Sequence, residues 1–273
     1  MRASPTTVLV TGATSGLGHA VAQTLATRHN THLILHGRSR ERLHDLASTL
    51  SDATADVEFV SADLADGQQV RQLAEDVAAR TDHLDVLVHN AGVGKGATDT
   101  RELTAEGYEL RLAVNYLAPF ALTQHLLPLL EAGAPSRIVN VASGAQEPVD
   151  FSDPHLKHDY SGNRAYAQSK FALVAYGFAL AKTVSAEVVT VNSLHPATLM
   201  PTRMVHEGYG RTVDDLQTGV DAVLNLIDNP NLAGTTGQYF SIQQPATAHP
   251  QTYDAQTQQA VWQLGEQLTQ VQY

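Results

Sequence analysis

The sequence predicts a single α/β domain, a doubly wound parallel sheet of about seven strands with helices on both faces. Short β-rich apolar runs alternate with longer helical patterns over most of the 273 residues. A glycine-rich turn joins the first apolar run to the first helical pattern. No Gly/Ser linker, charge block or repeat marks a second domain, so residues 1–273 are expected to form one unit.

The apolar runs have the length and the β-branched content of buried strands. The expected strands are Val8–Val10, Leu33–Leu35, Val57–Val60, Val86–Val88, Arg137–Val141, Val188–Val191 and Gln238–Ile242. The expected helices are Ala20–Arg28, Glu41–Leu50, Gln68–Ala79, Tyr108–Leu130, Ala165–Thr183 and Val213–Ile227. Ligands of such folds bind at the carboxyl ends of the strands, so the residues that follow each strand are the candidates for chemistry.

Three segments do not follow this alternation. Residues 144–164 are rich in Pro, Asp, His and Gly, and a connection of that length in a compact domain is usually functional. We expect them, together with residues 198–212, to form substrate loops. The polar C-terminal extension, 243–273, carries an apolar stripe at helical spacing: Val261, Leu264, Leu268 and Val271. The stripe is expected to pack on the same domain, with a contact in a homo-oligomer or a flap over the site as alternatives.

The composition narrows the possible partners. The 17 basic and 28 acidic residues give a net charge of −11, which argues against binding nucleic acid. No signal-peptide core and no apolar run of membrane-spanning length occurs, so no membrane partner is expected. The chain has no cysteine, which fits a cytoplasmic location, and its 13 histidines are scattered, so no metal site is predicted.

The first glycine-rich turn has the features of a phosphate-binding loop. In Thr11-Gly-Ala-Thr-Ser-Gly-Leu-Gly18, the three glycines suit a tight turn, close approach of the backbone to a phosphate, and close packing of helix on strand. Simple turn chemistry is the alternative for a glycine triplet. The candidate cofactor-binding residues here are Gly12, Thr14, Ser15, Gly16, Leu17 and Gly18.

The end of the second expected strand favours NADP(H) over NAD(H). Folds that bind NAD place an acidic residue there for the ribose 2′-hydroxyl, but this chain has Gly37 followed by Arg38. Arg38 is suited to a 2′-phosphate, with a solvated surface arginine as the alternative. Asp63, followed by Leu64, is a candidate acceptor for the adenine amino group or, equally, an N-cap of the next helix.

Tyr166 and Lys170 lie four positions apart on an expected helix, and therefore on one face. A nearby cation favours the ionised phenol, so the pair is a candidate general acid. Taken alone, the pair favours the alternative of a half-exposed tyrosine beside a solvated lysine, because this spacing occurs by chance in many helices.

The order of several motifs is more specific than any one of them. His89-Asn-Ala-Gly92 follows the fourth expected strand and Val139-Asn-Val-Ala-Ser143 follows the fifth. With the glycine loop, Asp63, Asn115 and the Tyr166/Lys170 pair, they resemble the short-chain dehydrogenase/reductase family, which has a Rossmann-type fold. The resemblance covers residues 7–242.

This resemblance implies a role for each matching residue. Tyr166 would exchange a proton with the substrate oxygen, and Ser143 would orient that oxygen. Lys170 would lower the pKa of the tyrosine and bind the nicotinamide ribose, and Asn115 would hold a water that links Lys170 to solvent. Besides the glycine loop, the expected cofactor-binding residues are Arg38, Asp63, Leu64, Asn90, Ala91, Gly92, Tyr166, Lys170, Pro196 and Leu199.

A proline supports the role implied for Asn115. Pro119 lies four residues later and has no N–H for the carbonyl of Asn115. We therefore expect a local kink in this helix, with that carbonyl oxygen available to a water.

The segment after the sixth strand departs from the family pattern, because Ala197 replaces the usual glycine. The backbone at Ala197 must therefore adopt an ordinary dihedral. Thr202 is shifted by one position from the usual hydroxyl, with Thr198 as a competitor, and His195 is expected to be a strand-end histidine.

Ser143 and Tyr166 lie 23 positions apart, which is longer than the family's common form. The longer loop is similar to that of the branch that contains retinol dehydrogenases and protochlorophyllide reductases. The membrane anchor of the retinoid enzymes is not found in the sequence, so a retinoid substrate is not supported.

The expected function is NADP(H)-dependent interconversion of a carbonyl and an alcohol on a small molecule. Reduction of an activated C=C bond is an alternative within enzymes. A non-catalytic, dinucleotide-binding regulator is the alternative from another class, and such regulators commonly lose catalytic residues that this chain keeps.

Overall fold

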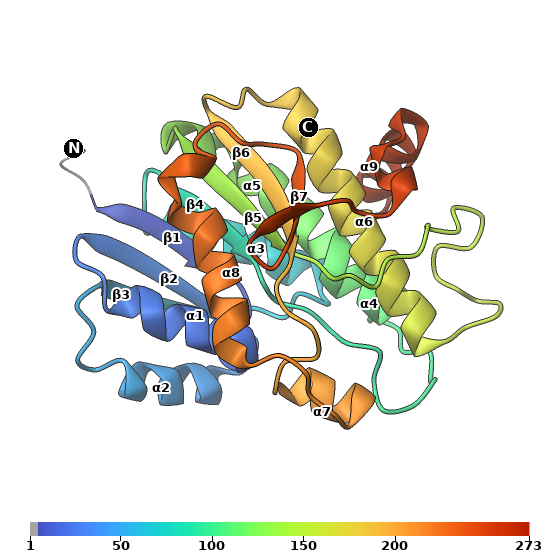
Figure 1. Ribbon diagram of the computed structural model, residues 1–273, viewed down its shortest axis with the longest axis horizontal. Helices are drawn as coiled ribbons and strands as arrows, with labels where there is room; N and C mark the ends of the chain where they lie inside the picture. The colour runs from blue at the N-terminus through green and yellow to red at the C-terminus, as the bar shows by residue number, and fades with distance from the viewer. Residues whose placement is uncertain (1–4, 273) are drawn as a thin grey trace.

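The computed structural model describes residues 5–272 and confirms one α/β domain with a Rossmann-type, doubly wound sheet (Figure 1). The described strands are β1 (Thr6–Val10), β2 (Thr31–Gly37), β3 (Asp56–Ser61), β4 (Val86–His89), β5 (Ser136–Val141), β6 (Val189–His195), β7 (Gln238–Ser241) and β8 (Gln244–Ala246). Their order is β3-β2-β1-β4-β5-β6-β7-β8. All neighbours pair in parallel except β7 and β8, which are antiparallel.

Helices cover both faces of the sheet (Figure 1). The described α-helices are α1 (Gly16–Ala26), α2 (Arg40–Thr49), α3 (Gly67–Ala78), α4 (Leu110–Leu112), α5 (Ala118–Ala132), α6 (Gly162–Thr183), α7 (Arg203–Tyr209), α8 (Leu216–Asp228) and α9 (Ala255–Thr269). The described residues also form a π-helical turn, η1 (Ala113–Leu117), and two 3₁₀ turns, η2 (Pro230–Leu232) and η3 (Pro250–Tyr253). One apolar core lies under α1 and α8, and another lies under α3, α5 and α6.

Burial on both faces explains the continuous apolar strands. All seven residues of β2 are buried, because helices shield each side of a parallel sheet. Side chains cap several helices: Ser161 accepts from the backbone N–H of Arg164 at the start of α6. No helix of residues 5–272 is long and apolar enough to cross a membrane.

All seven expected strands are present, but some boundaries were wrong. An eighth described strand, β8, is added to the sheet because residues 244–246 turn back along β7. The helix expected from Val213 begins at Leu216, where Asp215 accepts from the N–H of Thr218 at 2.7 Å. The helix expected over 108–130 starts at Leu110 and contains η1, which is where Pro119 predicted an irregularity. The N–H of Ala118 there donates to the carbonyl five residues earlier.

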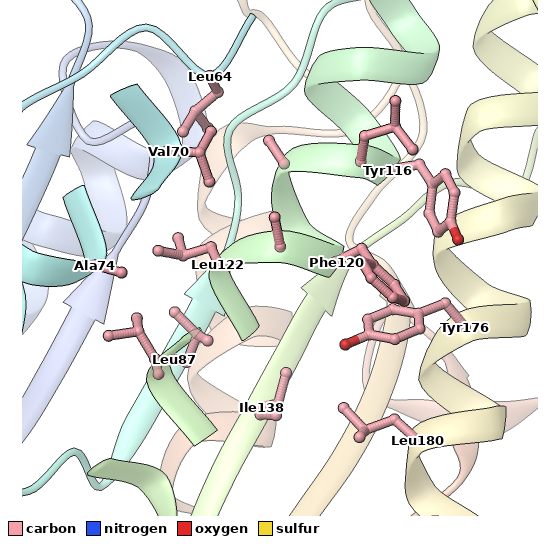
Figure 2. Close-up of a cluster of buried hydrophobic side chains, with 14 of the residues drawn as sticks. Leu64, Val70, Ala74, Leu87, Tyr116, Phe120, Leu122, Ile138, Tyr176 and Leu180 are labelled. Carbon is pink, nitrogen blue, oxygen red and sulfur yellow. The ribbon is translucent and has the colours of Figure 1, made fainter. Parts of the chain in front are cut away.

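The C-terminal stripe packs on the same domain. Val261 and Leu264 are buried, and Leu268 and Val271 pack against the core beneath α5 and α6. The phenol of Tyr116 donates to the Val261 carbonyl at 2.6 Å. Figure 2 shows Tyr116 close to Phe120 and Tyr176 on this side of the sheet.

Both expected substrate loops have internal structure. Residues 144–164 end in the first turn of α6, and residues 198–212 contain α7. The first of these loops is held on the segment before α4. Arg101 donates to the His155 carbonyl at 2.7 Å, Asp99 accepts from the N–H of Gly162 at 2.9 Å, and His155 stacks on Tyr108.

Candidate active site

The residues expected to carry the chemistry meet at the carboxyl ends of β4 and β5. Ser143 follows β5, and its hydroxyl lies close enough to the phenol of Tyr166 on α6 to influence the pKa of that phenol. Lys170 lies one turn further along α6, with its Nζ 5.9 Å from the centre of the Tyr166 ring. The structure therefore places a hydroxyl, a phenol and an ammonium next to one another.

Lys170 is almost fully buried, with 3% of its surface exposed. Its Nζ donates to the carbonyl of Val141 at 2.9 Å. Burial lowers the pKa of Lys170 to about 8, because the charged form loses its water. The side chain thus keeps its proton at neutral pH and loses it under mildly alkaline conditions.

The pKa of Tyr166 differs from the sequence-based expectation. Burial raises its pKa above the ordinary value, while the nearby Ser143 hydroxyl acts in the opposite direction. The expected net lowering by Lys170 was wrong for this structure, because desolvation of the phenol outweighs the other effects. The phenol is therefore protonated at neutral pH, which suits a proton donor.

Asn115 lies inside η1 and is fully buried. Its side chain accepts from the N–H of Val93 at 2.7 Å and donates to the Val93 carbonyl and to Ser169 Oγ, each at 2.9 Å. A Cβ on Gly92 would lie 3.3 Å from Asn115 Oδ1 and 3.4 Å from Lys170 Nζ. Asn115 therefore joins the segment that follows β4 to α6, beside Lys170.

The glycine loop has the backbone geometry of a cradle. Gly12 and Gly16 have φ angles of 69° and 54°, in the left-handed region that favours glycine. A Cβ on Gly18 would lie 2.3 Å from the Gly12 carbonyl oxygen, so only glycine allows this approach of helix to loop. Ser15 is exposed at the start of α1, Thr14 is half-buried and Leu17 is buried. The open side of this loop fits a pyrophosphate at the N-terminus of α1.

Asn90 and Thr11 hold the glycine loop on the end of β4. Asn90 Nδ2 donates to the carbonyls of Thr11 and Gly12, at 2.9 and 3.2 Å. Thr11 Oγ1 accepts from the N–H groups of Asn90 and Ala91, at 3.0 and 3.1 Å. Asn90 and Ala91 are thus part of the support of the loop.

His36 is a buried bridge that sequence reasoning missed. It lies near the end of β2 and is 2% exposed. The N–H of Gly12 points at His36 Nδ1 at 3.3 Å, so Nδ1 is the acceptor and the proton lies on Nε2. Nε2 then donates to the Ala62 carbonyl at 3.0 Å. Burial lowers the pKa of His36, against the opposing effects of the Ala62 bond and the Asp63 charge.

We predict that dinucleotide affinity falls at acidic pH. Protonation of His36 places a hydrogen on Nδ1, which can then no longer accept from the N–H of Gly12, so the glycine loop loses this support. The folded pKa lies below the ordinary value of 6.5, so the bridge is intact near neutral pH and is lost well below 6.5. The expected loss is about 3- to 10-fold once the pH falls below the lowered pKa of His36. NADH should be titrated fluorimetrically, since it has no 2′-phosphate to titrate in the same range. His36→Gln should flatten this profile, and an unchanged pH dependence would contradict the bridge.

Arg38 is exposed just beyond β2, where it can reach a ligand at the glycine loop. A Cβ on Gly37 would lie 2.4 Å from Thr14 Cγ2, so the end of β2 is tight against the loop. Asp63 does not cap α3, because Asp66 takes that position and accepts from the N–H groups of Gln68 and Gln69. Asp63 instead accepts from the N–H of Ala65 at 3.0 Å, and Leu64 is buried in the core.

The segment after β6 curves over the glycine loop. Ala197 is buried and lies outside the left-handed region, while Leu199 adopts a φ of 47°. Pro196 is buried beside them. Thr202 caps α7, and its methyl group would lie 3.2 Å from a Cβ on Gly16. Thr198 is turned away, because its hydroxyl lies 3.3 Å from His195 Nε2.

α7 covers the site from the other side. Met204 Cγ would lie 2.5 Å from a Cβ on Gly94, and Lys95 Nζ lies 5.1 Å from the centre of the Tyr209 ring. Tyr209 contributes to the raised pKa of Tyr166, so the two phenols are close.

Sequence patterns gave no signal for α7. The available signal for His36 was a polar residue directly after the apolar run Leu33–Leu35.

The sequence and the fold of this chain are similar to those of known proteins. The short chain dehydrogenase family model matches residues 6–210. Retinol dehydrogenase 13 from Homo sapiens is 34% identical over 242 residues, which cover 86% of this chain and 72% of that protein. An uncharacterized protein from Mycobacterium paratuberculosis has a solved structure with a TM-score of 0.78 at 27% identity, covering 99% of this chain and 97% of that chain. A short chain dehydrogenase from Escherichia coli CFT073, solved with NADPH, has a TM-score of 0.68 at 27% identity, with 88% and 97% covered.

The chain belongs to the short-chain dehydrogenase/reductase family. Within it, the relatives place the chain in the retinol dehydrogenase-like branch, as an oxidoreductase that uses a nicotinamide dinucleotide.

Proposed function

We propose that the enzyme interconverts a carbonyl and an alcohol on a small molecule, with NADP(H) as cofactor. The observation that carries this proposal is the proximity of the Ser143 hydroxyl to a protonated Tyr166, beside the buried ammonium of Lys170. Bound NADP(H) would supply or accept the hydride. Tyr166 donates the proton to the carbonyl oxygen during reduction, and Ser143 orients that oxygen.

Lys170 and Asn115 would resupply that proton. The side chain of Asn115 is occupied by Val93 and Ser169, so its main-chain carbonyl is the group we assign to a relay water. Pro119 supports this assignment because it has no N–H to give that carbonyl. Lys170 also suits the ribose hydroxyls, since its charge lies next to Gly92 at the end of β4.

The proposed cofactor-binding residues follow the same edge of the sheet. They are Gly12, Thr14, Ser15, Gly16, Leu17, Gly18, Arg38, Asp63, Leu64, Asn90, Ala91, Gly92, Tyr166, Lys170, Pro196 and Leu199. Residues 144–164 and 198–212 are the proposed substrate loops, because the first follows Ser143 and the second contains α7. The cytosolic location and a homo-oligomeric state stay predictions from the sequence.

Arg38→Ala tests the preference for NADP(H). Loss of a charge-assisted bond to the 2′-phosphate should weaken NADPH binding on the order of 10-fold or more and leave NADH binding within about 2-fold. Arg71→Ala, an exposed arginine on α3, is the matched control and should change neither value. Equal losses for the two dinucleotides would refute a contact between Arg38 and the 2′-phosphate.

A further inference from the structure

A pocket of about 430 Å³ opens beyond the carboxyl ends of β5, β6 and β7. Gly144, which follows Ser143, forms part of its wall, together with His195. Tyr239 also lines the pocket, and its phenol donates to the Ser143 carbonyl at 2.9 Å. The pocket therefore adjoins the residue that would orient the reacting oxygen.

The pocket lining mixes polar and apolar surface and has no charged carboxylate, lysine or arginine. Its polar side chains are those of Gln146, His195, Tyr239, Ser241, Thr247 and His249. Burial lowers the pKa of His195, against the charge of Asp214, so this imidazole is neutral near pH 7. A charged ligand group would lose its water here without an opposite charge, and a purely apolar group would offer no partner to the Ser241 and Thr247 hydroxyls.

The wall supplied by residues 246–249 is fixed before any ligand arrives. The N–H of His249 donates to Gln146 Oε1 at 3.0 Å, and the N–H of Ala248 donates to Tyr253 Oη at 3.0 Å. The His249 ring meets the edge of Phe171, whose centre lies 5.4 Å away. Phe171 follows Lys170 in α6, so the pocket wall packs directly against the candidate catalytic helix.

We propose that this pocket binds the distal end of the substrate, an uncharged group that carries hydroxyl or carbonyl oxygens. The inference rests on the proposed function, because the reacting carbonyl is taken to lie at Ser143 and Tyr166. The volume of the pocket is sufficient for one part of a small ligand. The preferred substrates are then medium-sized, neutral, oxygenated carbonyl compounds, and residues 246–249 help to determine this specificity.

The test uses aldehydes that share one reacting end and one spacer and differ only at the distal end. The four ends are methyl, hydroxyl, carboxylate and trimethylammonium, and kcat/KM with NADPH is measured for each. The hydroxylated aldehyde should exceed each of the others by about 5- to 10-fold, the ratio expected from one neutral hydrogen bond. His249→Leu and the near-isosteric Thr247→Val should reduce the hydroxyl-to-methyl ratio, while His44→Leu, on exposed α2, should leave it unchanged.

A higher kcat/KM for the methyl or a charged end would overturn the inference. So would an unchanged hydroxyl-to-methyl ratio in both pocket variants when their thermal melts match wild type. Equal turnover of all four aldehydes refutes the pocket assignment alone. No turnover of any carbonyl with either dinucleotide refutes the proposed function, and the substrate inference with it.

Discussion

Tyr166→Phe is expected to reduce kcat/KM by about 10²- to 10⁴-fold, the range for loss of a general acid. The phenol hydroxyl is the group that lies near Ser143, and phenylalanine keeps the ring beside Lys170 while removing only that hydroxyl. NADPH affinity and thermal stability should stay close to wild type. Steady-state NADPH oxidation, a binding titration and a thermal melt measure the three quantities.

Tyr176→Phe is the matched control, because the same atom is removed from another buried tyrosine of α6. This variant should keep most of its activity. The assignment of the proton donor fails if Tyr166→Phe is as fast as wild type. It also fails if the two variants are slowed equally, since that result would indicate damage to α6.

Lys170→Met is expected to have opposite effects on activity and stability. Turnover should fall by about 10²-fold or more, because the proton relay and its charge are lost. The free energy of unfolding should rise, because burial has lowered the Lys170 pKa from 10.5 to about 8, a cost on the order of 3 kcal/mol for a 3%-exposed group. Loss of the bond to the Val141 carbonyl offsets about 1–2 kcal/mol of this gain.

The pH dependence of unfolding gives an independent check on Lys170. A lowered folded pKa means that the unfolded chain binds more protons between about pH 8 and 10.5, so wild-type stability should rise through this window. The methionine variant should not show this rise. Lys182→Met, on the same helix but exposed, should retain it. A rise in stability that persists in Lys170→Met would show that the burial of Lys170 does not cause the pH dependence of unfolding in this range.

The sequence was sufficient for the fold because strand and helix periodicities alternate without interruption up to Ser143. It missed β8, since the short polar run 244–246 has no apolar period and becomes a strand only by pairing with β7. It also placed the start of α8 too early, because Val213 continues the apolar pattern while the cap is Asp215. Tertiary contacts decided both features.

The candidate site was predictable where a residue occupies a fixed place after a strand or on a helix face. Ser143, Tyr166 and Lys170 do so, and the structure brings them together. His36 and Tyr239 act through neighbours distant in sequence, Gly12 and the Ser143 carbonyl, so no local spacing identifies them. The direction of the Tyr166 pKa depends on how much water reaches the phenol, a quantity that only the folded chain defines.

The most direct measurement of the central claim is NADPH and NADH oxidation by the wild-type enzyme across a panel of aldehydes, ketones and activated alkenes, with product analysis. The account predicts that NADPH is consumed faster than NADH, and that each turnover converts one carbonyl to its alcohol. Oxidation of neither dinucleotide with any carbonyl, or turnover confined to the C=C bond of the alkenes, would contradict it.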